Sequence, residues 1–135
     1  MTRPSFDSWA LDGAQWSSLR AECTRRKVGA VLFSPDRRVI AQGYNGAAPG
    51  APSCLEGACP RGLKTTTEVA PGSSYDTGPG SCIATHAEAN ALLWAGKEAR
   101  GATLYITDDP CDGCWRLIRN AGVVRVVTPN GEHTP

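Results

Sequence analysis

The sequence has 135 residues, of which 41% are hydrophobic and 20% charged, and its formal net charge is +1 at pH 7. This length fits a single domain with one hydrophobic core, and the near-neutral charge argues against a dedicated nucleic-acid-binding protein, which needs a basic surface. No apolar run approaches the roughly 18 residues that span a membrane, and acidic residues interrupt the N-terminal segment where a signal peptide is apolar, so we expect no membrane partner and a cytoplasmic location.

The N-terminal part of the chain predicts a helix followed by a β-hairpin. Large side chains recur at intervals of three or four residues, which indicates an amphipathic helix that begins after Ser5; they are Phe6, Trp9, Trp16, Leu19 and Cys23, with Gly13 in the same series. Residues 28–33 and 38–42 read as two strands joined by a turn at Ser34-Pro35-Asp36. Residues 44–81 are rich in Gly, Pro, Ser and Thr. A loop of this length is usually functional or held by a metal.

The C-terminal part alternates helical and extended patterns. Residues 86–97 and 111–120 predict helices, and residues 103–107 and 123–127 predict strands. The first helix should bury Ala87, Ala91, Leu92 and Ala95, and the second should bury Leu117, Ile118 and Ala121. This order of elements predicts one α/β domain over residues 1–135, with three α/β/α layers around a central mixed sheet.

Two short motifs carry chemically specific side chains. His86 and Glu88 are two residues apart at the start of one expected helix, and Cys111 and Cys114 follow Pro110 at the start of the next. An imidazole nitrogen and two thiolates suit zinc, and three protein ligands leave the fourth position open for water. Glu88 could then take and return the proton of that water. A C-x-x-C pair alone could also be a redox pair or half of a structural zinc knuckle.

The position of these residues on helices supports a catalytic zinc site. Residues three apart on a helix share a face, so the sulfurs of Cys111 and Cys114 can reach one ion. Helix N-termini carry partial positive charge, which favours thiolates. The pair of motifs is similar to the H-x-E…P-C-x-x-C pattern of zinc deaminases of cytosine and adenine. The sequence therefore predicts hydrolytic deamination of an amino-pyrimidine or amino-purine.

Further segments resemble the deoxycytidylate (dCMP) deaminases. They are residues 23–31 (CTRRKVGAV), 43–46 (GYNG), 85–91 (THAEANA), 101–107 (GATLYIT) and 121–123 (AGV). The resemblance implies a cytidine-deaminase-like fold, a catalytic zinc, a homo-oligomer, and conversion of the nucleotide dCMP to dUMP and ammonia. It also implies that Asn45 contacts the sugar or phosphate and that the backbone of Ala87 recognises the pyrimidine. Asn45 could instead be a simple turn residue beside Gly46.

The basic run that follows Cys23 offers candidates for the phosphate. Arg25, Arg26 and Lys27 stand there, and a guanidinium can hold two phosphate oxygens. The alternative to phosphate binding is that these residues are a run of solvent-exposed charges at the end of a helix. Asp108 and Asp109 occupy positions where the family commonly has Leu-Ser, so a 5-substituted dCMP is a second candidate substrate.

Four cysteines lie outside the expected catalytic site and border the long loop: Cys23, Cys54, Cys59 and Cys82. Together they could form a tetrahedral thiolate site that holds a loop too polar to fold by apolar burial. Several dCMP deaminases are similar in carrying a second zinc at such positions, so we predict a second, structural zinc. The alternative is a set of free or buried thiols.

Two other functions are compatible with the motifs. One is deamination of a base in nucleic acid, which would call for a basic or aromatic surface; the charge argues against it, and we expect Trp94 and Trp115 in the core or an interface rather than as base stackers. The other is an inactive zinc-binding scaffold, against which the retained Glu88 argues.

Overall fold

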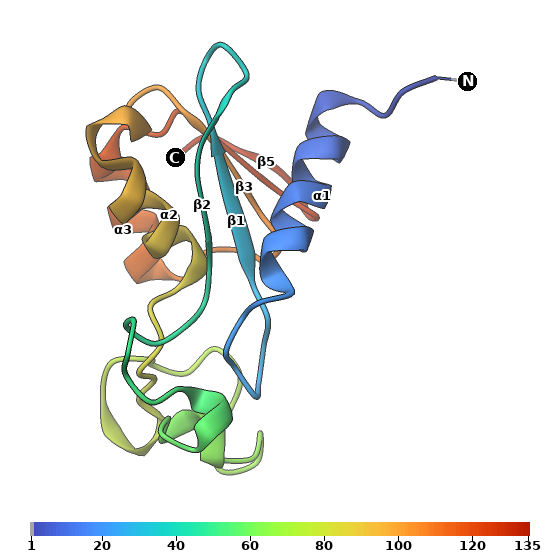
Figure 1. Ribbon diagram of the computed structural model, residues 1–135. Coiled ribbons are helices and arrows are strands. Elements are labelled where there is room, and N and C mark those ends of the chain that lie inside the picture. The colour runs from blue at the N-terminus through green and yellow to red at the C-terminus, as the bar shows by residue number, and fades with distance from the viewer. Residues whose placement is uncertain (1) are drawn as a thin grey trace.

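A five-stranded sheet with helices on both faces forms the body of the protein (Figure 1). The computed structural model describes residues 2–135. The strands are β1 (Gly29–Phe33), β2 (Val39–Tyr44), β3 (Thr103–Ile106), β4 (Arg125–Thr128) and β5 (Gly131–His133). They lie in the order β2-β1-β3-β4-β5, and only β3 and β4 pair in parallel. Helix α1 (Phe6–Ser18) covers one face, while α2 (Ala87–Ala95) and α3 (Asp112–Ala121) cover the other. The predicted three-layer fold with a mixed sheet is confirmed.

The two faces of the sheet are buried by alternate residues of the same strands. Ala30 and Leu32 of β1 belong to the core between the sheet and the pair α2 and α3. Val31 and Phe33, their neighbours in sequence, belong to the smaller core beneath α1. Because successive side chains of a strand point to opposite faces, β1 is buried along its whole length and forms the centre of the fold.

Helix α1 begins where the sequence predicts but buries a different face. Ser5 caps it, since its Oγ accepts a hydrogen bond from the Ser8 amide at 3.2 Å. The expected core residues are largely exposed, with Trp16 at 70% and Leu19 at 69%, and the helix ends at Ser18 rather than near Cys23. The buried residues are small ones: Ala10, Ala14, Ser17 and Ser18. The cause is close packing, because a Cβ on Gly29 of β1 would lie only 1.9 Å from the Ala14 carbonyl oxygen.

The C-terminal elements match the prediction with four corrections. The strand predicted at residues 123–127 runs from Arg125 to Thr128, which leaves Val124 outside it and 58% exposed. Helix α2 buries Ala87, Ala91, Leu92 and Ala95 as expected, and it gives way at Gly96 to a short 3-10 helix (Gly96–Ala99). In α3, Ile118 is fully buried but Leu117 is 50% exposed, because Ile118 shares the sheet-facing side with Cys114, one turn earlier. Strand β5 is short and polar, and the hydrophobic pattern did not predict it. Within residues 2–135 no helix combines the length and apolarity needed to cross a membrane.

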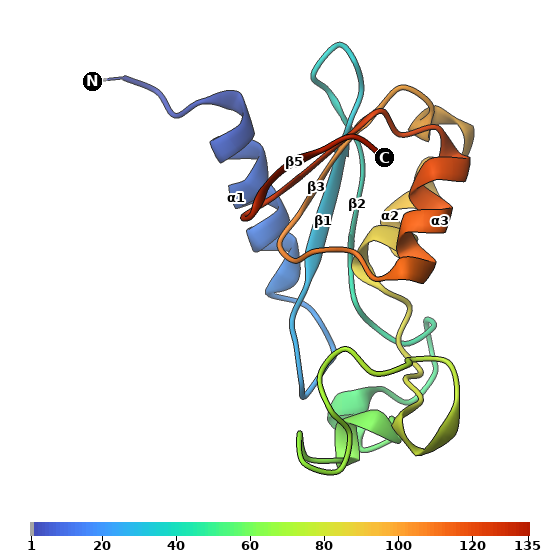
Figure 2. The same ribbon diagram turned by 180° about the vertical axis from the view of Figure 1, so that it is seen from behind.

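The long segment between β2 and α2 is irregular, as predicted, and carries three short 3-10 helices: Cys54–Glu56, Arg61–Leu63 and Gly78–Gly80. It lies at the end of the sheet where α2 and α3 begin (Figure 2). Two guanidinium groups hold it together. Arg61 is 4% exposed and donates to the carbonyls of Ser74 and Gly80 at 3.0 Å. Arg25 donates to the carbonyls of Lys64 (3.1 Å), Thr65 (3.4 Å) and Val69 (2.9 Å). Hydrogen bonding to the guanidinium groups of the buried Arg61 and the partly buried Arg25 therefore orders this polar segment.

A charged network fixes α1 to the sheet through Asp7 and Arg125. We expect Asp7→Asn to lower the free energy of unfolding at pH 7 by about 1 kcal/mol, because both side chains of this ion pair are partly exposed. Asp7 accepts hydrogen bonds from Arg125 and, at 2.6 Å, from the Tyr105 hydroxyl. The Arg125 guanidinium is the main reason that the pKa of Asp7 falls to about 2. A carboxyl group whose pKa is lower in the folded state stabilises the folded protein at pH values above its unfolded pKa, which is near 4. This stabilisation is lost as the pH falls towards 2. Urea unfolding of the wild type and Asp7→Asn from pH 7 to pH 3 should therefore show a difference in the free energy of unfolding that decreases as the pH falls. A difference that stays constant would contradict the ionic role of Asp7.

Candidate active site

The three predicted zinc ligands meet where α2 and α3 begin. His86 is the N-cap residue of α2, Cys111 is the N-cap residue of α3, and Cys114 lies in the first turn of α3. His86 Nδ1 is 3.3 Å from Cys114 Sγ and 3.5 Å from Cys111 Sγ. Across residues 2–135 these three form the one group of His, Cys, Asp or Glu side chains whose ligand atoms all lie within 4.8 Å of one another. Their predicted convergence is confirmed.

The spacing of the trio fits a tetrahedral zinc ion. Zinc lies about 2.0–2.1 Å from an imidazole nitrogen and about 2.3 Å from a thiolate, so a tetrahedron places nitrogen and sulfur about 3.5 Å apart. The observed separations of 3.3 and 3.5 Å agree with this edge length. His86 and Cys111 also line a cavity, so the open side of the trio faces a space that substrate can enter.

Burial sets the protonation of the ligands. It lowers the pKa of His86, with Arg26 adding a smaller effect in the same direction, so the imidazole is neutral and can bind a metal. Burial and the neighbouring Glu88 carboxylate raise the pKa of Cys114. A cation is therefore what would make Cys114 a thiolate, since a coordinating thiol loses its proton to the metal.

Glu88 lies beside the metal ligands in the first turn of α2. It is 4% exposed, and its carboxyl group contacts the Cys114 thiol at the edge of the cavity. Burial is the main reason that its pKa is raised. A carboxyl group with a raised pKa next to a metal is suited to take up and release a proton near neutral pH.

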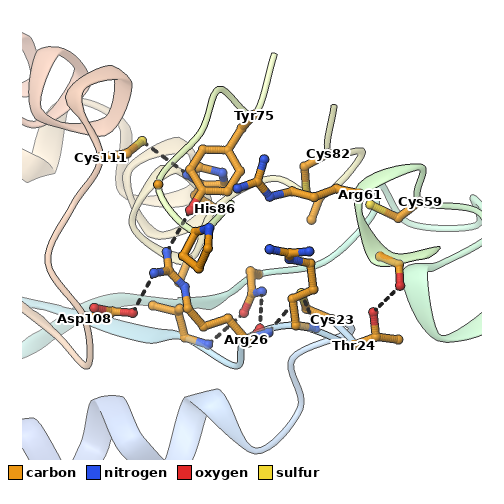
Figure 3. Close-up of a pocket in the computed structure, with 18 of the residues that line it drawn as sticks. Cys23, Thr24, Arg26, Cys59, Arg61, Tyr75, Cys82, His86, Asp108 and Cys111 are labelled. Carbon is orange, nitrogen blue, oxygen red and sulfur yellow. Dashed lines mark hydrogen bonds and ion pairs between the residues drawn. The ribbon is translucent and has the colours of Figure 1, made fainter. Parts of the chain in front are cut away.

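A cavity of about 480 Å³ opens beside the trio and is within the usual size range for small-molecule sites (Figure 3). Its wall combines the starts of α2 and α3, the segments that follow α1 and β3, and the irregular segment. The residues that line it include His86, Glu88 and Cys111 of the zinc site, together with Arg25, Arg26, Asn45, Arg61, Tyr75, Ala87 and Asp108.

The structure separates the three predicted phosphate candidates. Arg26 lines the cavity, donates to the Tyr75 hydroxyl at 3.1 Å and pairs with Asp108 at 3.1 Å. Arg25 also lines it, but its guanidinium is engaged by three backbone carbonyls. Lys27 is exposed and is not among the residues that line the cavity. Arg26 is therefore the basic residue of this run with exchangeable partners at the cavity.

Asn45 positions the backbone that carries Arg26. It is 8% exposed, its Oδ1 accepts from the Val28 amide at 2.8 Å, and its Nδ2 donates to the Arg26 carbonyl at 2.9 Å. Its backbone φ is not positive, so the alternative of a left-handed turn residue beside Gly46 is not borne out. Asn45 thus supports the cavity wall, and its expected contact with the sugar or phosphate stays a prediction.

The sequence did not predict Tyr75 and Arg61 as site residues. The Tyr75 ring meets the His86 ring edge to face, with centroids 4.7 Å apart, and the Arg61 guanidinium lies 4.3 Å above the same Tyr75 ring. Both residues come from the irregular segment, where no periodicity guides interpretation. One signal was present, since Tyr75 is the sole Phe, Trp or Tyr residue between Tyr44 and Trp94.

The four remaining cysteines lie around the irregular segment, and their thiols contact one another or backbone amides. The Cys59 and Cys82 thiols hydrogen-bond each other, and Cys54 Sγ accepts from the Thr24 amide at 3.4 Å. Cys23 Sγ accepts from the amides of the second and third residues after it, both at 3.3 Å. Amides that donate to sulfur suit thiolates. The four sulfurs do not, however, form a second cluster in which all ligand atoms lie within 4.8 Å among the described residues.

The sequence is similar to one family of known proteins. The family described as "Cytidine and deoxycytidylate deaminase zinc-binding region" matches residues 4–129. A deoxycytidylate deaminase of Mycobacterium phage D29 is 47% identical over 131 residues, covering 96% of this chain and 98% of the relative. A deoxycytidylate deaminase of Schizosaccharomyces pombe is 42% identical over 93% of this chain, which spans only 37% of that longer protein.

Solved structures agree with these matches. The dCMP deaminase of cyanophage S-TIM5 in complex with dCMP and dUMP has a TM-score of 0.66 and 25% identity, over 95% of this chain and 83% of the other. A cytidine deaminase of Mycobacterium leprae, 19% identical, has a TM-score of 0.57 over 98% of this chain and 94% of that chain, and it shows the shared fold.

Proposed function

Because this chain belongs to the cytidine and deoxycytidylate deaminase family, we propose that it catalyses the zinc-dependent hydrolytic deamination of dCMP to dUMP and ammonia. The observation that carries the proposal is the convergence of His86, Cys111 and Cys114 beside the buried carboxyl group of Glu88. The phage relative named for this activity is similar over nearly its whole length, and the cyanophage neighbour binds dCMP and dUMP.

The reaction adds the oxygen of water to C4 of the cytosine ring and breaks the bond between C4 and the amino nitrogen. Held by His86, Cys111 and Cys114, zinc would supply Lewis acidity that lowers the pKa of water towards about 7. Glu88 takes the proton that water loses, delivers it to the ring nitrogen N3, and then moves a proton to the departing amino group. Burial of Glu88 keeps bulk water from competing for these protons.

One backbone amide and one side chain position the nucleotide. The Ala87 amide is in the first turn of α2, where amides have no partner within the helix, so it can donate to the pyrimidine. Arg26 is the ligand of the 5′-phosphate, because its partners are a hydroxyl and a half-exposed carboxylate. Arg25 and Arg61 are instead engaged by backbone carbonyls.

Ammonia release from a panel of substrates tests the function, and Arg26→Gln tests the phosphate site. We expect the highest kcat/KM with dCMP among dCMP, CMP, deoxycytidine, 5-methyl-dCMP and single-stranded DNA. Loss of a charge-assisted contact worth about 1.5–3 kcal/mol should raise KM for dCMP about 10- to 100-fold in Arg26→Gln. Lys27→Gln removes the same charge outside the cavity and is the matched control. Preference for DNA or for 5-methyl-dCMP would replace the proposed substrate.

A second zinc site is proposed at Cys23, Cys54, Cys59 and Cys82. Its support is the set of amides that donate to the sulfurs of Cys23, Cys54 and Cys59. The site requires these thiols to move closer together on binding, since zinc–thiolate bonds of about 2.3 Å place sulfurs under 4 Å apart. It would add a metal to a segment that already depends on the hydrogen bonds of Arg25 and Arg61.

We also propose a homo-oligomer in the cytoplasm. Leu93 and Trp94 on α2 are 72% and 80% exposed, and Leu117 on α3 is 50% exposed. Large apolar side chains gathered on one pair of helices favour a protein interface. All six cysteines are free thiols, which suits a reducing compartment where they remain available to metals.

A further inference from the structure

Asp108 lies in the cavity wall directly against the proposed phosphate ligand. It follows β3, whose antiparallel pairing with β1 runs from Phe33↔Thr103 to Ala30↔Ile106. The hydrogen bond from the Thr107 amide to the Gly29 carbonyl at 3.0 Å extends the pairing, so Asp108 comes next to the segment that carries Arg26. Its Oδ1 accepts from the Asp109 amide at 2.9 Å, which leaves Oδ2 on Arg26 at 3.1 Å. The backbone therefore holds this carboxylate in place.

The ion pair is exposed enough to exchange. The side chains of Arg26 and Asp108 are 51% and 39% exposed, and pairs with such exposure contribute little stability. Arg26 keeps a separate anchor in the Tyr75 hydroxyl, and Tyr75 is itself fixed between Arg61 and His86 (Figure 3). The guanidinium can thus release Asp108 without losing its place in the cavity.

A phosphate group is the stronger partner for this guanidinium. It carries about −1.5 to −2 charges at pH 7 and three acceptor oxygens, whereas Asp108 offers one charge and already uses one oxygen on the backbone. Both anions require the same donor group of Arg26, and their like charges disfavour binding side by side. The carboxylate and the phosphate therefore compete.

We propose that Asp108 sets the affinity for the nucleotide by occupying the phosphate site on Arg26 until the 5′-phosphate of the substrate displaces it. The inference rests on the proposed function, since it needs a phosphorylated substrate. A nucleoside without phosphate leaves the ion pair in place. Asp108 thus determines how strongly the phosphate distinguishes dCMP from deoxycytidine.

Steady-state kinetics of Asp108→Asn test the proposal. Removing the competing charge should lower KM for dCMP about two- to fivefold, equivalent to about 0.4–1 kcal/mol, while the kinetics with deoxycytidine stay the same. In an Arg26→Gln background the substitution should have no effect on KM, because the contested donor is gone. Asp109→Asn is the matched control: Asp109 also lines the cavity, but its carboxylate accepts from Asn130 at 2.9 Å.

Three results would overturn the proposal: a higher KM for dCMP in Asp108→Asn, an equal gain in Asp109→Asn, or a gain that persists without Arg26. Titration of inorganic phosphate, followed by NMR on the zinc-loaded wild type and Asp108→Asn, keeps the test independent of turnover. Tighter phosphate binding by the variant is expected, and unchanged binding also overturns the proposal. Failure of the wild type to deaminate dCMP would instead reject the proposed function, and the phosphate titration would still decide the role of Asp108.

Discussion

Glu88→Gln is expected to lower kcat for dCMP by about 10²- to 10⁴-fold while the protein keeps its catalytic zinc. Glutamine has nearly the same volume as glutamate and can fill the same buried space, where Glu88 is 4% exposed. It cannot accept a proton, so the transfer from water to the ring nitrogen loses its carrier. The metal should remain, because its three ligands are His86, Cys111 and Cys114. Ammonia release and zinc content measured on the same sample check both parts.

Glu98→Gln is the matched control for Glu88. It makes the same chemical change at an exposed residue of the 3-10 helix that follows α2, so kcat should stay within about twofold of the wild type. Loss of zinc from Glu88→Gln would show that the carboxyl group binds the metal. Full activity with zinc retained would show that another group carries the proton.

The metal site could be predicted from the sequence because each of its two halves is local. Cys111 and Cys114 are brought together by a single helical turn, and His86 caps another helix that carries Glu88 in its first turn. Both helices start at the same end of the sheet, and residue types alone define the ligand chemistry. The strand at residues 28–33 and the small buried face of α2 were likewise predicted from the pattern of apolar residues.

What the sequence did not predict depends on contacts between distant segments. The buried face of α1 is set by the close approach of Gly29 to Ala14, which excludes the tryptophans that the spacing favoured. Arg25 and Arg26 are neighbours with the same side chain. Their roles differ because the first reaches the carbonyls of Lys64 and Val69, while the second reaches Tyr75. An irregular segment carries no periodic pattern that could predict such partners.

Cys111→Ala is expected to remove the catalytic zinc and lower kcat by at least about 10³-fold, because water then returns from a pKa near 7 to its ordinary value near 15.7. Two ligands remain, and one of them, Cys114, has a pKa that burial raises, so it holds a proton more firmly once the cation is weakened. The fold should persist, since Cys111 stands at a helix N-cap outside the two hydrophobic cores. Zinc content per chain, activity and circular dichroism measure these three results.

Cys59→Ala separates the two metal sites and serves as the control for Cys111→Ala. With both sites filled, the wild type should bind two zinc ions per chain, and each variant should bind one. Cys59 is 2% exposed beside Gly62 in the irregular segment, so its loss should leave His86, Cys111 and Cys114 intact but make residues 44–81 more susceptible to proteolysis. A single zinc in the wild type would exclude the four-cysteine site. A zinc content unchanged by Cys111→Ala would exclude the catalytic one, because the substitution removes one of its three ligands.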